Sequence, residues 1–317
     1  MEGQVDDIQS RVMSWVGKVP DEHRDFEVPK DQVLTSGIKP ELLAKLDANG
    51  LPSRVVDGTK HYDGFDLSNI SLHMSLPSLQ KMAMRCWKSA LHMADGADEL
   101  SFRLEYKIEP NELKKGNGPL RVLIPFEGRK DAAPSELVWS GTFVRATRPL
   151  LLPTEVADLL HSTLEGVKFY MLREGLRWQT SFIEKTKLAE CGGASKLLCL
   201  KASARDIQAR QLFGLILAQP YAAPHFWTEF MIDGEWIAAD PMLLRVLHMS
   251  SGLSPETWPE HRSPGAVLLP LSEVIGYEPE MGRPILQGLE SEAFRIDPIV
   301  TQNERDVTAS FPLKTST

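Results

Sequence analysis

The spacing of apolar residues predicts that the first part of the chain is mainly helical. Apolar side chains recur at helical intervals over residues 5–17, 40–48 and 75–93. The remainder of residues 20–68 is polar and rich in proline and glycine, which predicts loops around the middle helix. We therefore expect residues 1–98 to form an N-terminal extension of helices and loops.

The pattern changes to alternation after residue 98. Alternating polar and apolar positions predict strands over residues 101–110, 120–128 and 136–147, which together form an accessory β-rich segment, 101–147. Helical spacing then returns over 154–174 and, more briefly, over 180–188.

The stretch from Glu190 to Pro241 carries the clearest pattern. It predicts a helix beginning at Cys191, a strand over 208–217, a strand over 225–232 and a return strand over 235–240. Asp233-Gly234 is a strong two-residue hairpin signal, so Ile232 should pair with Glu235. That register makes His225 and Asp240 neighbours near the open end of the hairpin.

The region after Pro241 is rich in proline and predicts looser structure. We expect a catalytic core over residues 99–300, which includes the accessory segment, and a flexible tail over 301–317.

Composition excludes several classes of function. The net charge of −8 and the lack of a basic stripe argue against a nucleic-acid partner. No apolar run approaches the roughly 18 residues that a membrane span requires, and the first thirty residues do not form a signal peptide. The three cysteines form neither a C-x2-C metal pattern nor an even disulfide framework, so we expect free thiols and a cytoplasmic location.

Cys191, His225 and Asp240 supply the residue types of an activated-thiol enzyme. A cysteine at a helix N-terminus is expected to have a lowered pKa, and Gly192-Gly193 would leave room for an acyl group beside it. His225 can take the thiol proton, and Asp240 can orient the imidazole. Each residue alone is more often structural, so the interpretation depends on their joint order. Cys86 and Cys199 fall inside predicted helices and are expected to be inert core thiols.

The same segment resembles the transglutaminase-like superfamily. In that family a helix-capping cysteine, a His-x-Trp-x-Glu strand and an Asp-Pro after a hairpin occur in this order, as do Cys191, His225-Phe226-Trp227-Thr228-Glu229 and Asp240-Pro241 here. Ile207-Gln208-Ala209-Arg210 is similar to the family's Gly-Ile-Pro-Ala-Arg segment, with Asp206 and Gln208 in place of the usual glycine and proline. Gly192 departs from the aromatic residue that follows the cysteine in the animal enzymes.

The resemblance implies an α+β, papain-like fold in which the nucleophile helix packs on an antiparallel sheet. It also implies acyl transfer through a thioester, with an oxyanion held by the Cys191 backbone N–H and a second donor from upstream, and Gly192 is a further oxyanion or substrate candidate. Trp178 and Gln179 are the candidates for that donor, and packing is the alternative role for Trp178. Fold support is implied for Trp227, Glu229, Trp236 and Arg210. No cofactor or metal is expected, because no histidine has an i, i+4 histidine partner on a helix.

The triad does not select the substrate. Water as acceptor would give a protease, peptidase or deamidase, whereas an amine would give a transamidase or amide synthase. The donor would be a peptide, an amide or an acyl thioester, including one bound to a carrier protein. A non-catalytic binding module that keeps the fold is the alternative outside the enzymes. Oligomeric state does not follow from the sequence.

Overall fold

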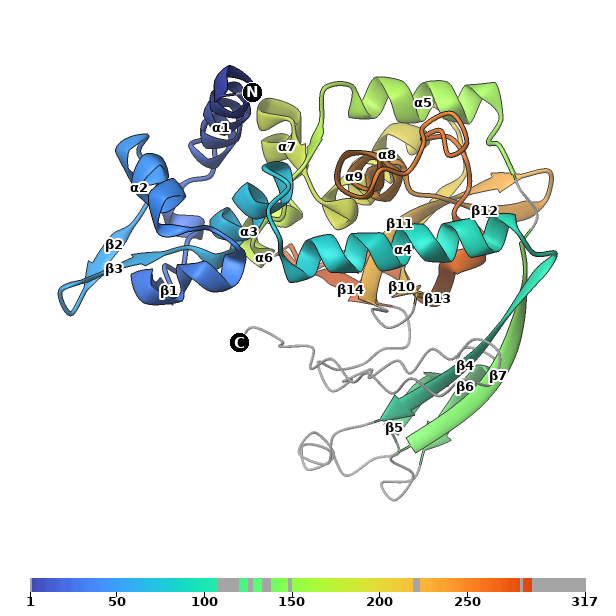
Figure 1. Ribbon diagram of the computed structural model, residues 1–317. Coiled ribbons are helices and arrows are strands. Elements are labelled where there is room, and N and C mark those ends of the chain that lie inside the picture. Colours follow the sequence, from blue (N-terminus) through green and yellow to red (C-terminus); the bar gives the residue numbers. More distant parts are fainter. Residues whose placement is uncertain are drawn as a thin grey trace.

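The protein is described here by a computed structural model that covers residues 2–107, 120–124, 128–132, 138–147, 150–218, 223–279 and 282–286. Helices and strands are mixed along the chain, and the largest sheet lies beside a layer of helices (Figure 1). The predicted tail, 301–317, lies outside the described residues.

The largest sheet is antiparallel and has five strands in the order β12-β11-β10-β13-β14. The strands are β10 (Ala209–Ile216), β11 (Ala223–Ile232), β12 (Glu235–Ala239), β13 (Leu268–Tyr277) and β14 (Pro284–Leu286). Ile232 pairs with Glu235, so the predicted hairpin register is confirmed. Asp233 (φ 50°) and Gly234 (φ 85°) both have the positive φ that a type I′ turn requires.

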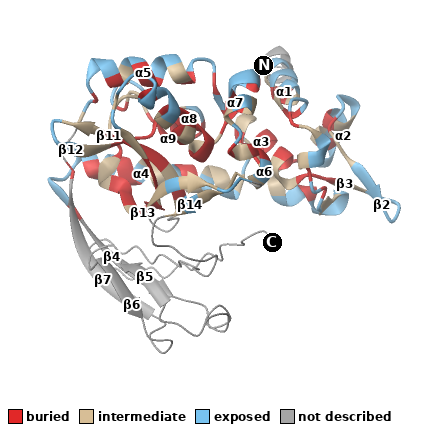
Figure 2. Cartoon of the chain, turned by 180° about the vertical axis from the view of Figure 1, so that it is seen from behind, coloured by how far each residue is buried: buried red, intermediate tan, exposed pale blue. Residues whose placement is uncertain are grey.

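Helix α8 (Cys191–Ser203) packs on β10 and β11, which confirms the predicted arrangement of a nucleophile helix on an antiparallel sheet. Its small and aliphatic residues face the sheet: Ala194, Leu197, Leu198 and Ala202 are at most 2% exposed. Helices α4 (Leu79–Asp95), α5 (Thr154–Leu164) and α9 (Pro241–Ser251) enclose the same apolar core. Figure 2 shows the buried residues concentrated where these helices meet the sheet.

The predicted helix over 154–174 is wrong in its second half. Helix α5 ends at Leu164, and Gly166 adopts a φ of +71°, which the right-handed helix cannot continue. The chain then forms β8 (Lys168–Phe169), which pairs in parallel with β9 (Leu188–Ala189). Two short helices, α6 (Glu174–Arg177) and α7 (Thr180–Thr186), connect these strands and lead to α8.

The region after Pro241 is more regular than its proline content predicts. Asp240 caps α9 and Pro241 occupies its first turn, where a proline needs no backbone N–H. Strand β13 then inserts beside β10 and completes the middle of the sheet, and a 3-10 helix (Gly265–Val267) precedes it.

The N-terminal extension has its own apolar cluster. Helices α1 (Glu2–Val16), α2 (Pro40–Ala48) and α3 (Gly64–His73) surround a three-stranded sheet of β1 (Val28–Pro29), β3 (Thr59–Tyr62) and β2 (Arg54–Val56). Two 3-10 helices (Asp21–His23 and Lys30–Ser36) connect these elements. Helix α3 was not predicted, because its residues fall in the stretch interpreted as loops. Asp63 caps it by accepting from the N–H groups of Phe65 and Asp66.

The accessory segment forms the predicted strands and one more. Strand β4 (Glu99–Lys107) pairs with β7 (Val138–Ala146), and β5 (Leu120–Ile124) pairs with β6 (Gly128–Ala132), all antiparallel. These strands extend away from the five-stranded sheet (Figure 1).

Candidate active site

Cys191 is the first residue of α8, as the sequence predicts. The first bond within this helix runs from the N–H of Ala194 to the carbonyl of Glu190, at 3.0 Å. The N–H groups of Cys191, Gly192 and Gly193 therefore precede the helical ladder and point from its positive end. The thiol is free and partly buried.

His225 and Asp240 are hydrogen-bonded to each other. His225, on β11, is 8% exposed and Asp240 is 3% exposed, so the bond is sheltered from water. The Nε2 atom of His225 lies against Oδ2 of Asp240, and the other oxygen of Asp240 accepts from the N–H of Leu243 at 2.9 Å. One carboxylate thus orients the imidazole and caps α9.

The three side chains form one cluster. The Sγ of Cys191, a ring nitrogen of His225 and a carboxylate oxygen of Asp240 all lie within 4.8 Å of one another. An ionised Asp240 accepts only, so Nε2 of His225 carries the hydrogen of the His–Asp bond. In the neutral imidazole Nδ1 is then the acceptor. The arrangement can withdraw a proton from a nucleophile in the way a Cys-His-Asp triad requires.

The charges around the thiol act against the predicted lowering of its pKa. Burial raises the pKa of Cys191 well above its ordinary value, and the carboxylates of Asp240 and Glu190 raise it further. Arg177 and the N–H of Cys191 itself oppose this increase. The sequence places the helix end correctly but does not show that two buried carboxylates lie beside it. These effects favour the protonated thiol over the thiolate.

The two glycines after Cys191 allow close packing behind the nucleophile. A Cβ on Gly192 would lie 2.7 Å from the ring of Trp178, and one on Gly193 would lie 2.3 Å from the carbonyl oxygen of Arg177. The prediction that these glycines leave room for an acyl group is therefore replaced by a role in helix packing against α6.

The side chains suggested as oxyanion donors are engaged elsewhere. The indole N–H of Trp178 donates to Glu174 at 2.7 Å, and Trp178 is 3% exposed. The amide of Gln179, an exposed residue, donates to the carbonyl of Gly175 at 2.7 Å. Trp178 nevertheless lies beside the cluster, through its contact with Gly192.

The residues expected to support the fold contact one another across β10, β11 and β12. Arg210 donates to Glu229 at 2.7 Å and stacks 4.3 Å from the ring centre of Trp236. The ring of Trp227, 1% exposed, lies nearly parallel to that of His225, with centroids 6.4 Å apart. These contacts hold β10, β11 and β12 together.

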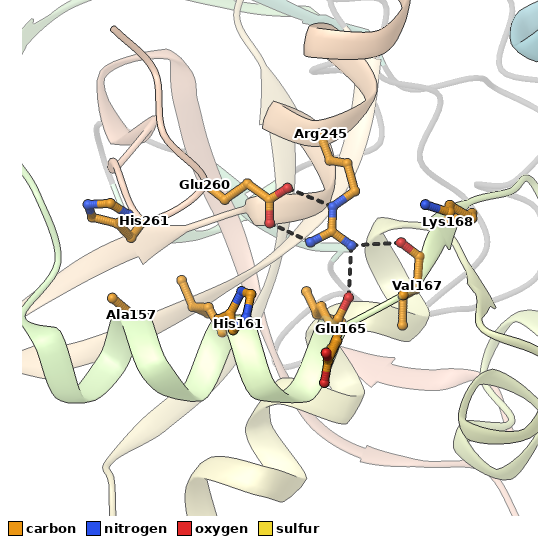
Figure 3. Close-up of a pocket in the computed structure, with 11 residues that line it drawn as sticks. Ala157, His161, Glu165, Val167, Lys168, Arg245, Glu260 and His261 are labelled. Atoms are coloured by element: carbon orange, nitrogen blue, oxygen red, sulfur yellow. Dashed lines mark hydrogen bonds and ion pairs between the residues drawn. The ribbon is translucent and has the colours of Figure 1, made fainter. Parts of the chain in front are cut away.

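A surface pocket of about 410 Å³ lies elsewhere, between α5, β8 and the start of α9. Arg245 dominates it, because its guanidinium pairs with Glu260 and donates to the carbonyls of Leu164 and Val167 (Figure 3). None of the predicted site residues lines this pocket. Its lining residues include no cysteine, so it supplies no thiol for covalent chemistry.

Cys191, His225 and Asp240 also have the residue types that ligate zinc. Their bonds do not fit that use. The near atoms of His225 and Asp240 are bonded to each other, and the second oxygen of Asp240 is bonded to Leu243, so these groups are not directed at a common ion.

A comparison with protein-family profiles finds a match in the region that contains the cluster. Residues 167–241 match the sequence profile of the Transglutaminase-like superfamily, and this range contains all three residues of the cluster. Residues 167–241 are therefore similar to the core of that superfamily, as the motifs predict. A search of curated proteins finds no match.

Among solved structures, the chain is similar to a crystal structure from Cytophaga hutchinsonii that is named, provisionally, as a cysteine protease. The identity is 14% and the TM-score 0.31, over 51% of this chain and 49% of the other. The aligned part thus spans about half the length of that relative. In the residues that the structure describes, no helix combines the length and apolar character needed to cross a membrane.

Proposed function

We propose that the protein is a cysteine enzyme that transfers acyl groups through a thioester on Cys191. His225 acts as general base and then general acid, and Asp240 orients it. The observation that carries this proposal is the His225–Asp240 bond, which leaves the second ring nitrogen available within a cluster whose reactive atoms lie within 4.8 Å.

The reaction would proceed in two displacements. As Sγ of Cys191 attacks the donor carbonyl, its proton passes to Nδ1 of His225 and the carbonyl oxygen becomes an oxyanion. Collapse of this intermediate breaks the bond to the leaving amine or thiol, which receives the proton from His225. The acceptor then gives its proton to His225 and attacks the thioester. As the carbon–sulfur bond breaks, His225 returns the proton to Sγ of Cys191 and the acylated acceptor is released.

Because the pKa of the Cys191 thiol is raised, we favour transfer of its proton to His225 during the attack. The imidazolium formed in that step is stabilised by Asp240, which is its buried hydrogen-bond partner. For the oxyanion we favour the N–H groups of Cys191 and Gly192, since they stand at the start of α8 before its hydrogen-bond ladder.

The acceptor defines two versions of this function. An amine acceptor gives amide formation, and water gives a peptidase or deamidase. Donors of either kind are peptides, amides or acyl thioesters, including thioesters on a carrier protein. A non-catalytic binding module is the competing class, and the intact Cys191, His225 and Asp240 cluster disfavours it.

Intact-protein mass spectrometry tests the proposal. The protein is offered panels of amide, ester and thioester donors, and we expect a mass increase equal to the acyl group, located on Cys191 by peptide mapping. Adding amines to the acylated protein should then identify the acceptor, because the productive one removes the adduct faster than water does.

The Cys191→Ala variant is the matched control. It should fold normally and form no adduct, because the other two thiols are embedded in helices. Turnover that survives in Cys191→Ala, or an adduct on Cys86 or Cys199 instead, would contradict the covalent mechanism.

A further inference from the structure

An ion pair lies directly behind the nucleophile and has no part in the mechanism described so far. Glu190, the residue before Cys191, pairs with the Nε of Arg177 on α6. Arg177 also pairs with Glu174 at 3.1 Å, and Glu174 accepts from the indole of Trp178. The pair is partly covered: the side chains of Arg177 and Glu190 are 27% and 12% exposed.

This pair is fixed to the nucleophile by packing as well as by sequence. The ring of Trp178 contacts Gly192, and the carbonyl of Arg177 contacts Gly193. The guanidinium of Arg177 lies 5.0 Å from the centre of the Trp178 ring. Arg177 and Glu190 are therefore held at a fixed place beside the start of α8.

The groups that face the thiol carry a surplus of negative charge. His225 on β11 and Asp240 at the start of α9 form the cluster with its sulfur, Glu190 directly precedes it in the chain, and Arg177 on α6 pairs with Glu190. Two carboxylates oppose one guanidinium, so the local field disfavours a thiolate. Because the site is partly buried, the effective dielectric constant is lower than that of water, and each of these charges has a stronger effect on the thiol.

We propose that Arg177 and Glu190 are positioning residues that set the charge state of Cys191. Glu190 disfavours the thiolate in the resting protein, and Arg177 offsets the negative charge that develops on sulfur during attack. The inference rests on Cys191 being the nucleophile, as proposed above.

The direction of each residue's effect agrees with this assignment. The charge of Glu190 raises the pKa of the Cys191 thiol and that of Arg177 lowers it. Burial raises the pKa of Glu190 itself, and Arg177 opposes that change by direct pairing. Glu190 thus acts on the thiol while it remains bound to Arg177.

The test is the pH dependence of iodoacetamide alkylation, followed for each cysteine by mass spectrometry from pH 6 to pH 11. Glu190→Gln keeps the shape of the side chain and removes its charge. We expect the midpoint for Cys191 to fall by about one pH unit, which is about a tenfold faster reaction at a pH below the midpoint. Cys86 and Cys199 serve as internal references and should not change.

Glu174→Gln is the matched control, because Glu174 contacts the same arginine and the same tryptophan but does not adjoin the cysteine. Its midpoint should stay near that of the wild type. The double variant Arg177→Gln/Glu190→Gln removes one charge of each sign, so its midpoint should lie between those of the wild type and Glu190→Gln.

An unchanged Cys191 midpoint in Glu190→Gln would overturn the proposal, as would an equal decrease in Glu174→Gln. If Glu190→Gln does not fold, the double variant provides the comparison with Glu174→Gln, and a midpoint equal to that of the control would overturn the proposal. Alkylation needs no turnover, so its result is independent of the acylation test. A shifted midpoint without any acylation would support the effect of Glu190 on the thiol and contradict the proposed enzyme function.

Discussion

At the scale of single residues, Asp240 combines two roles that are usually separate. One of its oxygens binds the imidazole of His225, and the other caps α9 at the N–H of Leu243. The sequence allowed the first role to be predicted, because the Asp233-Gly234 turn fixes the register. The helix that the same aspartate begins was not predicted, although Asp-Pro before an apolar run is a helix-start signal, because the later prolines suggested looser structure.

Asp240→Asn separates these roles. Asparagine is a good N-cap, so the free energy of unfolding should change by less than about 1 kcal/mol. The neutral amide cannot stabilise the imidazolium, so kcat/KM should fall by about 10²- to 10⁴-fold. Steady-state kinetics and urea unfolding of the same sample check both expectations. A large loss of stability with little loss of rate would show that Asp240 serves only the helix.

The direction of the thiol pKa was the main failure of prediction at this scale. A cysteine at a helix start suggests a stabilised thiolate, and that local rule is sound. Here burial and two carboxylates outweigh it. Asp240 is distant in sequence, and Arg177 lies between the two predicted helices, on a short helix that was not predicted, so their positions beside Cys191 become apparent only in the folded chain.

At the scale of elements, Gly192 and Gly193 let the first turn of α8 pack closely against α6. Gly193 lies so close to the carbonyl of Arg177 and the side chain of Ile183 that no Cβ fits without movement. The sequence predicted the helix and its start, but the reason for the glycine pair required the position of α6. That position was obscured because apolar residues continue at helical spacing past Gly166.

Gly193→Ala should therefore be destabilising although alanine is the better helix former. We expect a loss of about 1–3 kcal/mol in the free energy of unfolding, because overpacking shifts α6 against α8. Gly96→Ala, at the end of α4, is the control: its Cβ would meet nothing closer than 3.8 Å. Chemical denaturation gives the free energy of unfolding of both variants. A Gly193→Ala variant as stable as the wild type would show that α6 can shift at little energetic cost.

At the scale of the whole molecule, the N-terminal extension is bonded to the segment between β8 and α6. The amide of Asn69 on α3 donates to the carbonyl of Met171 at 2.9 Å and accepts from its N–H at 2.8 Å. Arg173 pairs with Asp63 at 2.8 Å and with Glu27 at 2.6 Å. The extension was predicted as a separate helical part, but nothing in its sequence indicated which surface it covers.

The pH dependence of stability should report this contact. Burial lowers the pKa of His73 from 6.5 to about 4, and its Nε2 is bonded to the carbonyl of Phe169 at 2.8 Å. The folded protein thus favours neutral His73: the contribution is complete above about pH 6.5 and is lost as the pH falls toward 4. Buried Asp66, with a pKa raised to about 6, acts in the opposite direction between pH 4 and 6.

His73→Gln isolates the histidine, since glutamine can donate to Phe169 and does not titrate. Between pH 7 and pH 5 the variant should lose about 1–2 kcal/mol less unfolding free energy than the wild type, allowing for partial exposure of the ring. His92→Gln, at an exposed position of α4, should follow the wild type. Equal losses in His73→Gln and wild type would show that His73 is not buried in its neutral form.

The bonds between Asn69 and Met171 join residues 102 positions apart, which implies an order of events in time. During synthesis, α3 leaves the ribosome well before the segment at 169–171 exists. If the extension has formed its own apolar cluster by then, α3 presents Asn69 to the segment at 169–171 as that segment emerges.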